Sequence, residues 1–477
     1  MLATPMQIIT GQMGQITAFI FFLLMIWVGY NQIKAWYQNP ITISAHPQIR
    51  FLIFIFSVFI FIILTGFFLI SWPLEWWTLG LAVAIGFSIS ILGSMGALSF
   101  LAALLLVRPW EISKADPLIE ILPRAAAIVV LGMFLIRMIS EKRLKIFWSR
   151  ECTLLVLFAA WLFMSTSQGS APAAAEMAYW ETVARGAILF LMVVNILRRE
   201  ADILVLKNVL VGAALSVTLL AITYSVFFSQ TDMTGRLTYI GLLGDPNDIT
   251  AFTILAMPFA IKPLWDRRHT TLGYLFALMY LAISLVIIYL AQSRGAILAL
   301  LTLFICIVIF KSKNKKRAIL FAGFFALLYF PAQNLLKREQ DDLKQSGASR
   351  IIYWKTAINM VVRHPLTGVG FNDYPNQYDN YLTDSMSFES GKRTAHSSWF
   401  LVLAEAGFIG FFLFFGIFLY SLKRAYKIIN EYPEYLFSLL SYGVAMSFLS
   451  HTYLLFPYLI FAFTLVSSTI LSNKEKI

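Results

Sequence analysis

The chain has 477 residues, of which 59% are hydrophobic and 13% are charged, and its mean hydropathy is +0.75. Soluble globular proteins carry about 25% charged residues, so this composition excludes an ordinary water-soluble domain and a disordered chain. The 37 lysines and arginines outnumber the 25 acidic residues. Because the basic residues lie mostly in short loops between apolar runs, they indicate membrane orientation and not nucleic-acid binding.

Apolar runs divide the chain at intervals that suit repeated membrane crossings. A span needs about 20 apolar residues and each pass takes roughly 30, so this length corresponds to about 14 crossings. The runs are continuously apolar and lack the alternation of barrel strands, which predicts helices. We therefore expect an all-α polytopic membrane protein with about 14 transmembrane helices, one of them a long tilted helix over 76–107. The runs lie near residues 16–35, 50–71, 76–107, 121–139, 151–166, 179–197, 208–228, 247–262, 271–291, 295–310, 318–331, 398–420, 434–450 and 453–471.

Basic residues set the expected orientation of these helices. The segment from Lys311 to Arg317 is the densest basic segment beside an apolar run, so the positive-inside rule places it in the cytoplasm. Counting runs from there puts residues 230–247, 292–295 and 333–397 on the outer face. The last of these is the only long loop, and we expect the chemistry to lie there, beside short helices in the membrane interface.

This orientation predicts four segments. Residues 1–75 form an extra N-terminal pair of transmembrane helices, and residues 76–332 form a membrane helix bundle. Residues 333–397 form a periplasmic loop domain with short amphipathic helices. Residues 398–477 form the C-terminal transmembrane helices and a short cytoplasmic tail.

Arginines on the outer face are the first candidate site residues. Arg294 stands in AQSRGAILAL, directly before Gly295 and a predicted helix, where a guanidinium and backbone N–H groups would bind an anion together. The alternative is an arginine that extends to the lipid head groups, although the charge rule disfavours arginine on this face. The same argument covers Arg236, Arg350 and Arg363, and several guanidinium groups on one face suit a diphosphate.

His396 and Glu405 share the start of one apolar run, TAHSSWFLVLAEAGFIG. His396 stands at the foot of the run, either as a polar group satisfied by solvent or as a catalytic group. Glu405 lies deep in the run and should face the bundle interior or a watery cavity, for function or for a structural partner. Gly407 and Gly410 are expected to be close helix contacts. The segment from Leu366 to Tyr374 is expected to be a turn with close backbone approach, because it lacks the spacing of a nucleotide loop.

The segment from Gly244 to Asp248 first indicates a helix start, with Asp245 as N-cap and Pro246 at the first helical position. A divalent metal pair is the alternative, but no acidic cluster lies elsewhere on the outer face to support it. Cys152 and Cys306 lie in apolar runs without metal-type spacing. No metal and no cofactor are therefore expected.

Four segments occur in an order that is typical of one family. They are DPND after Arg236, SRGA at Ser293 to Ala296, RIIYWKTAINMVVRHPLTGVGFNDY from Arg350 to Tyr374, and AHSSWFLVLAEAGFIG from Ala395 to Gly410. Together they resemble the O-antigen ligase-related superfamily, over roughly residues 120–470. The resemblance implies a multi-pass glycosyltransferase of the GT-C type in the bacterial inner membrane, with its active site facing the periplasm.

The resemblance also implies roles for individual residues. The expected reaction moves a glycan from an undecaprenyl-diphosphate carrier to lipid A-core or a similar acceptor, with inversion and without a metal ion. The essential histidine of the family maps onto His396, the arginine of its S-R-G element onto Arg294 and a second arginine onto Arg236. We expect both arginines to stabilise the leaving diphosphate and His396 to act as general base. Further expected contacts to the diphosphate or glycan are Arg350, Arg363, Tyr353, Trp354, Tyr374, Glu405, Asp245 and Asn247. The three aromatic residues among them would stack on sugars or sit at the membrane interface.

Several alternatives share the sequence features described so far. A ligase, a repeat-unit polymerase and a protein O-oligosaccharyltransferase of this superfamily differ only in their acceptor, and we favour the ligase. A flippase or transporter for the lipid-linked glycan would need ionisable groups through the bilayer midplane, where the later spans have few apart from Glu405. The expected partners are the lipid-linked donor, a lipid A-core, glycan or protein acceptor, and membrane lipids.

Overall fold

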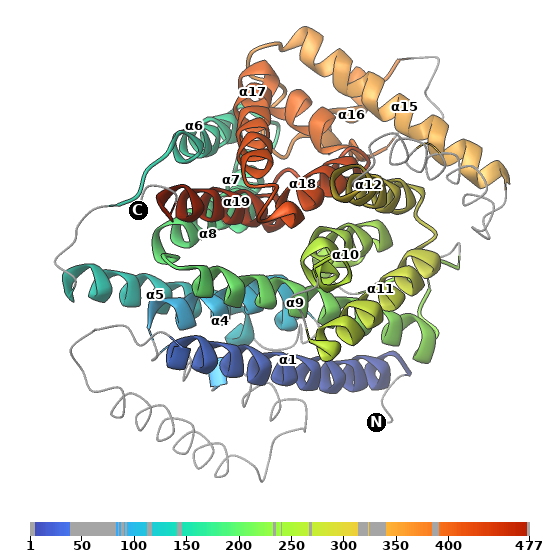
Figure 1. Cartoon of the computed structure of the whole chain (residues 1–477). Coiled ribbons are helices and arrows are strands. Elements are labelled where there is room, and N and C mark those ends of the chain that lie inside the picture. Colours follow the sequence, from blue (N-terminus) through green and yellow to red (C-terminus); the bar gives the residue numbers. More distant parts are fainter. Residues whose placement is uncertain are drawn as a thin grey trace. The chain divides into compact units, whose positions relative to one another are not determined.

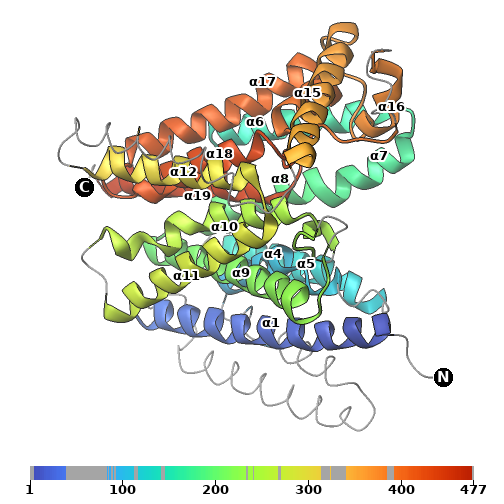
Figure 2. The same cartoon turned by 90° about the vertical axis from the view of Figure 1, so that its right-hand side faces the viewer.

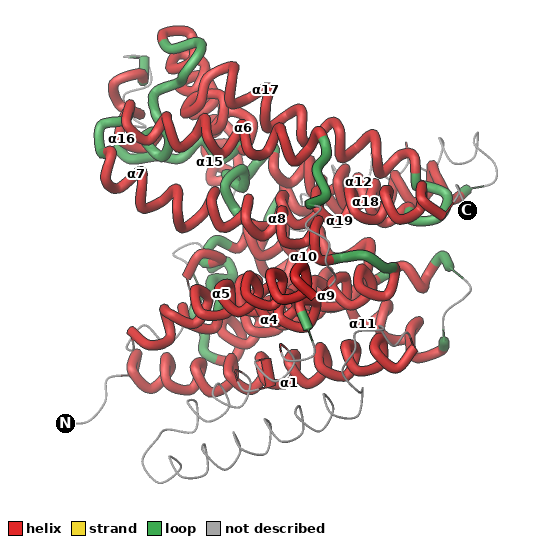
Figure 3. The backbone as a smooth tube through the Cα atoms, turned by 90° about the vertical axis from the view of Figure 1, so that its left-hand side faces the viewer, coloured by secondary structure: helices red, strands yellow, loops and turns green. Residues whose placement is uncertain are grey.

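The computed structural model describes residues 5–38, 83, 85–86, 90, 93–111, 117–140, 146–231, 235–239, 241–266, 270–312, 323, 340–383 and 391–474. Within these residues every regular element is a helix (Figure 3), apart from one isolated bridge between Thr231 and Leu237. The expected all-helical class is therefore confirmed. The chain divides into two compact units, the first made of Met1–Ile146 and Asn195–Ile249, the second of Phe147–Val194 and Thr250–Ile477.

The first unit is a bundle around a short, nearly fully buried helix (Figure 1). This helix, α4, contacts α1, α5 and α9, and α1 also contacts α9. Gly212 of α9 allows the close approach, because an added Cβ there would meet the side chains of Leu24 and Trp27. The bounds are α1 (Pro5–Gln38), α4 (Ser94–Val107), η1 (Pro109–Glu111), α5 (Pro117–Ser140), α9 (Glu200–Phe227) and η4 (Gly241–Leu243).

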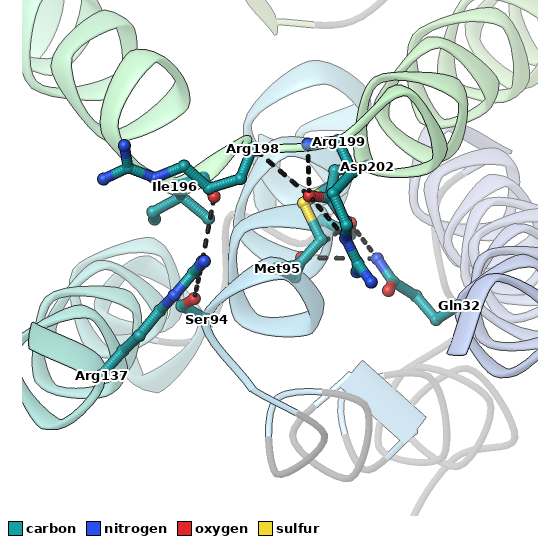
Figure 4. A network of polar contacts seen from close by, with 9 residues as sticks. Gln32, Ser94, Met95, Arg137, Ile196, Arg198, Arg199 and Asp202 are labelled. Atoms are coloured by element: carbon teal, nitrogen blue, oxygen red, sulfur yellow. Dashed lines mark hydrogen bonds and ion pairs between the residues drawn. The ribbon is translucent and has the colours of Figure 1, made fainter. Parts of the chain in front are cut away.

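Polar side chains inside the first unit are paired with helix ends (Figure 4). Arg137 donates to the carbonyl of Ile196 at 3.0 Å and to Ser94. Asp202 accepts from the backbone N–H groups of Arg198 and Arg199 at the start of α9, and pairs with the Arg199 guanidinium at 2.9 Å. These cations complete helix termini, as expected of arginines near a membrane boundary.

The second unit is a bundle around α17 (Figure 2), which contacts α6, α15, α18 and α19, while α12 contacts α18. Ion pairs lie between its helices: Glu151 of α6 is bound by Arg424 of α17, and Glu434 of α18 by Lys262 at 3.0 Å. The bounds are α6 (Arg150–Ser165), η2 (Thr166–Gln168), α7 (Pro172–Tyr179), the π-helical turn η3 (Trp180–Ala184), α8 (Arg185–Ile196), α10 (Pro246–Ala260), η5 (Lys262–Leu264), α11 (Thr271–Ala291), α12 (Arg294–Lys311), α15 (Gln340–Arg363), α16 (Tyr374–Tyr381), α17 (Ser398–Lys427), α18 (Pro433–Met446) and α19 (Leu455–Lys474).

Eight helices among the described residues are long and apolar enough to cross a membrane. They are Met13–Gln32, Arg150–Gln168, Pro172–Ile196, Glu200–Phe227, Thr271–Ala291, Arg294–Lys311, Ser398–Lys427 and Leu455–Ser472. The protein is thus a multi-pass membrane protein. Of the remaining predicted runs, 50–71 and, apart from residue 323, 318–331 lie outside the described residues, so the count of about 14 stays a prediction.

One expected helix is wrong. The single long helix over residues 76–107 is interrupted at Gly93, whose φ of 132° is outside the helical region, and α4 begins at Ser94. Glycine adopts this conformation at little steric cost. The backbone N–H of Gly93 donates to the carbonyl of Ser90 and its carbonyl accepts from Ala97, so the interruption leaves both groups hydrogen-bonded.

Candidate functional site

The turn between α11 and α12 brings Arg294 to the start of a helix. Gln292 ends α11 in a left-handed conformation with a φ of 49°, and the Ser293 hydroxyl accepts from the backbone N–H of Ala296 at 3.2 Å. Ser293 is therefore the N-cap of α12, and Arg294 is the first helical residue. The predicted turn and helix start are confirmed.

Arg294 and Arg350 line one cavity of about 270 Å³. The α15 residues at this cavity follow helical spacing and share one face, so that α15 presents a guanidinium and an indole one turn apart. An added Cβ at Gly347 would lie 3.9 Å from Nη2 of Arg294, which shows that the Arg294 side chain extends to α15. The lining residues are Arg294, Gly295, Leu298, Gly347, Arg350, Ile351, Trp354 and Phe448.

Aromatic rings hold the polar groups of the cavity. The guanidinium carbon of Arg350 lies 5.8 Å from the centre of the Phe448 ring. Trp354 stacks on Phe400, with ring centres 5.2 Å apart and planes 16° apart. Its Nε1 is buried and has no hydrogen-bond partner among the described residues. Two guanidinium groups at one cavity therefore favour an anionic ligand.

His396 lies just before α17 and packs against the helix that lines the cavity. Its ring centre is 5.8 Å from that of Tyr353, and Tyr353 directly precedes Trp354 on α15. His396 has a φ of 44°, a left-handed conformation that is strained for this residue type and common at functional sites. The predicted position at the foot of an apolar helix is confirmed.

Hydrogen bonds fix the segment that carries His396. The Ser398 hydroxyl donates to the Leu449 carbonyl at 2.6 Å, and the Thr452 hydroxyl donates to the Ser398 carbonyl at 2.7 Å. Thr394 and Ser450 share a hydroxyl hydrogen bond of 2.8 Å. His396 is therefore flanked on both sides by residues that are tied to the turn between α18 and α19.

Arg363 is not part of the cavity. It lies 13 residues after Arg350 on the same helix, which corresponds to about 20 Å along the axis. Its guanidinium carbon is 5.3 Å from the centre of the Tyr381 ring, and Tyr381 also contacts His364 through a 2.7 Å hydrogen bond. Arg363 belongs to an exposed cluster at the end of α15, and its expected substrate contact stays a prediction.

Tyr374 and Glu405 are both buried behind the cavity helix, with 0% and 2% of their surface exposed. The Tyr374 hydroxyl donates to the Tyr353 carbonyl at 2.8 Å, and Oε1 of Glu405 accepts from the Tyr374 backbone N–H at 3.1 Å. Burial raises the pKa of Tyr374 above its usual value, so its hydroxyl stays a donor. These hydrogen bonds are with other groups of the protein, and direct contact of either residue with substrate stays a prediction.

The loop between α15 and α16 is joined by backbone hydrogen bonds to a break in α17. Gly407 has a φ of 63° and a ψ of −166° inside the helix. The backbone N–H groups of Val369 and Gly370 donate to the carbonyls of Ala404 and Glu405 at 2.9 and 3.1 Å. Two further bonds join Phe408 N–H to the Pro365 carbonyl at 2.8 Å and Trp161 Nε1 to the Ala406 carbonyl at 2.9 Å. The predicted close backbone approach is confirmed.

Asp373 holds the other end of this loop in place. The sequence did not predict this role of Asp373. Its carboxylate accepts from the backbone N–H and the hydroxyl of Ser170, at 2.8 and 2.5 Å, and from the side-chain amides of Asn376 and Gln377. Burial disfavours the charged form, but these hydrogen bonds outweigh it and lower the pKa of Asp373. Ser170 follows η2, so Asp373 fixes the loop to the end of the α6 segment.

Three predicted site residues belong to the first unit. Asp245 accepts from the backbone N–H and the side-chain amide of Asn247, both at 2.7 Å, directly before α10. The predicted N-cap is confirmed for Asp245. Arg236 is partly buried beside the short bridge at Leu237. The roles of Arg236, Asp245 and Asn247 in substrate binding stay predictions.

No group of three His, Cys, Asp or Glu side chains that could hold a metal ion occurs among the described residues. Asp245 and Asp248, the pair considered from the sequence, both lie at the start of α10, where Asp245 has the capping contacts described above.

The helices and the cavity define a class, a multi-pass membrane protein with a pocket that two arginines line. Residues 279–415 match the sequence model of a family described as O-antigen ligase. This segment runs from α11 into α17 and contains both cavity arginines, His396 and Glu405. The resemblance to the O-antigen ligase-related superfamily is thereby confirmed over these residues, and the match supports a glycosyltransferase-type enzyme at the family level only. No curated protein matches the chain.

Proposed function

We propose that the protein transfers a glycan from an undecaprenyl-diphosphate carrier to an acceptor at the periplasmic face of the bacterial inner membrane. The observation that carries the proposal is the cavity in which Arg294 of α12 and Arg350 of α15 meet. Planar guanidinium groups bind phosphate oxygens through paired N–H donors.

The size of the cavity fits the reacting head group. Its volume of about 270 Å³ lies near the lower end of the roughly 300–1,000 Å³ of typical ligand pockets. This space suits a diphosphate and an adjoining sugar, and not a whole glycan with its polyprenyl chain. The rest of the donor would therefore lie outside the cavity.

The proposed reaction is a single displacement at the anomeric carbon of the donor sugar. The acceptor hydroxyl oxygen forms the new glycosidic bond, while the bond from the anomeric carbon to the diphosphate oxygen breaks. Arg294 and Arg350 stabilise the charge that collects on the leaving diphosphate. His396 accepts the proton of the acceptor hydroxyl, a contribution of typically 10²–10⁴-fold. Arg236 is proposed as an additional cation for the diphosphate.

Lipid A-core is the acceptor we favour, with a growing glycan or a protein as the alternatives. The test is transfer by the purified full chain in detergent, supplied with undecaprenyl-diphosphate-linked glycan in EDTA, with and without lipid A-core. Glycan joined to lipid A-core would support a metal-independent ligase. Longer chains on the carrier without added acceptor would instead identify a polymerase.

His396→Ala is the matching variant for this assay, and we expect it to lose transfer by 10²-fold or more. His364→Ala is its control, since His364 is exposed and bonded to Tyr381 at the end of α15. Full activity of a correctly inserted His396→Ala protein would refute the assignment of His396. Absence of any glycosidic product from the folded wild-type protein would refute the proposed function.

A further inference from the structure

We infer that Glu405 is a positioning residue, which holds the cavity helix α15 against His396 through Tyr374. The inference rests on the proposed function for its link to transfer. It gives Glu405 a different role from substrate binding, because the residue acts through a chain of protein contacts. Tyr374 transmits the hold of Glu405 to α15.

The first step is the contact between Glu405 and the loop. Glu405 is 2% exposed and is not among the residues that line the cavity. Its Oε1 accepts from the backbone N–H of Tyr374 at 3.1 Å, and its backbone carbonyl accepts from Gly370 at 3.1 Å. Its Oε2 atom is buried and has no hydrogen-bond partner among the described residues. The side chain and the main chain of one residue thus hold two points of the same loop.

The second step is the contact between Tyr374 and α15. Tyr374 is the first residue of α16 and is completely buried. Its hydroxyl donates to the Tyr353 carbonyl at 2.8 Å. Because the backbone of Tyr374 is held by Glu405 and its side chain by α15, this residue sets the distance between the two helices at that level. The Tyr378 ring, which lies 6.0 Å from Tyr374 and 5.8 Å from Tyr353 between ring centres, fills the adjoining space.

The third step joins α15 to both parts of the site. The Tyr353 ring packs on His396 at 5.8 Å, and the next residue, Trp354, lines the cavity together with Arg350. A shift of α15 relative to α17 would therefore move the diphosphate-binding face and the contact with His396 together. Misplacement of reacting groups by about 1 Å can cost 10²-fold in rate.

The role needs a hydrogen-bond acceptor and not a negative charge. Glutamine keeps a carbonyl oxygen for the Tyr374 N–H. Leucine has a similar size and offers no acceptor. If Glu405 instead acted on substrate as a base or an ion, glutamine would fail as leucine does.

The experiment compares Glu405→Gln, Glu405→Leu and Tyr374→Phe in the purified full chain, with kcat and donor KM for glycan transfer. We expect Glu405→Gln to stay close to wild type. Glu405→Leu should lower kcat/KM for transfer by about 10²-fold and Tyr374→Phe by about tenfold, because α15 carries both the diphosphate-binding face and the contact with His396. Tyr381→Phe is the matched control, since its hydroxyl bonds His364 at the exposed end of α15.

Hydrogen exchange of the peptide that covers residues 366–378 gives a readout that is independent of activity. Glu405→Leu should speed exchange there and Glu405→Gln should not. Normal kcat/KM in both Glu405→Leu and Tyr374→Phe would overturn the inference, as would an inactive Glu405→Gln protein with wild-type exchange. If wild type itself shows no transfer, the proposed function fails, while unchanged exchange in Glu405→Leu would separately refute the contact.

Discussion

Two guanidinium groups reach one cavity from different helices, and each is oriented by its surroundings. Arg294 is fixed at the start of α12 by the Ser293 cap, and Arg350 lies over the Phe448 ring. A guanidinium presents several N–H donors in one plane, whereas an ammonium group is a single point of charge. We therefore expect arginine and lysine to differ in function at these positions, although both side chains are positively charged.

Substitution by lysine tests this directly. Arg294→Lys and Arg350→Lys should each lower kcat/KM for transfer by about 10²-fold, the loss typical when one donor to a developing anion is removed. Arg363→Lys is the control, because Arg363 is exposed at the far end of the same helix. A near-normal rate for Arg294→Lys would show that this residue only anchors the helix.

The residues of the site differ in how well the sequence alone predicts them. Arg294 and His396 stand out as polar groups at the edges of apolar runs, and Arg350 stands out as an arginine in the loop predicted on the outer face. Phe448 has no such signal, since it is one of 42 phenylalanines in an apolar chain. Its place under Arg350 depends on a contact between distant segments, which periodicity cannot reveal.

At the scale of elements, the loop between α15 and α16 is a fixed connector. Asp373 holds one end of the loop to Ser170. Because hydrogen bonds lower the pKa of Asp373 in the folded protein, its contribution to stability is present above the unfolded pKa of about 3.9. The contribution is lost as the pH falls through the lower, folded pKa.

Asp373→Asn should therefore lower the melting temperature of the detergent-solubilised protein at pH 7, where the carboxylate accepts four hydrogen bonds. The difference from wild type should shrink steadily as the pH is lowered below about 4. Asp379→Asn is a matched control on the exposed side of α16. A difference that stays constant from pH 7 to the acid range would contradict a role for the ionised form.

Elements were predictable wherever local pattern decides them. The helical spans, the helix start at Arg294, the cap at Asp245 and the backbone approach near Gly368 all follow from spacing and residue type. The break at Gly407 could not be predicted in this way, because a glycine between apolar residues is also typical of a close contact between helices. Only the position of Leu366 beside it shows why: a side chain at Gly407 would collide with the Leu366 carbonyl.

At the scale of the whole molecule, α12 and α17 of the second unit each begin near the candidate site and end at a lysine. α12 begins at Arg294 and ends at Lys311, and α17 begins beside His396 and ends at Lys427. Trp354 stacks on Phe400, in the first turn of α17, and lines the cavity with Arg294, so both helices begin at the site. The positive-inside rule then favours a site on the periplasmic face.

Cysteine labelling tests this orientation. The native Cys152 and Cys306 are both buried, which keeps the background of labelling low. Asn380→Cys, on α16, should react with a membrane-impermeant maleimide in intact cells with a permeable outer membrane. Lys423→Cys, near the end of α17, should react only after the inner membrane is opened. The reverse pattern would contradict the proposed orientation.

The connection between the loop and the break in α17 also bears on how the protein tolerates mutation. The N–H groups of Val369 and Gly370 and the carbonyls that they contact belong to the main chain, so these bonds persist whatever side chains the loop carries. The glycines with positive φ, among them Gly368 and Gly407, restrict the local sequence, as do the hydrogen-bonded side chains of Asp373 and Tyr374. Leu366 is 61% exposed, so we expect substitutions of its side chain to leave these bonds intact. Changes to the exposed surface of this loop are therefore expected to leave its connection to α17 in place.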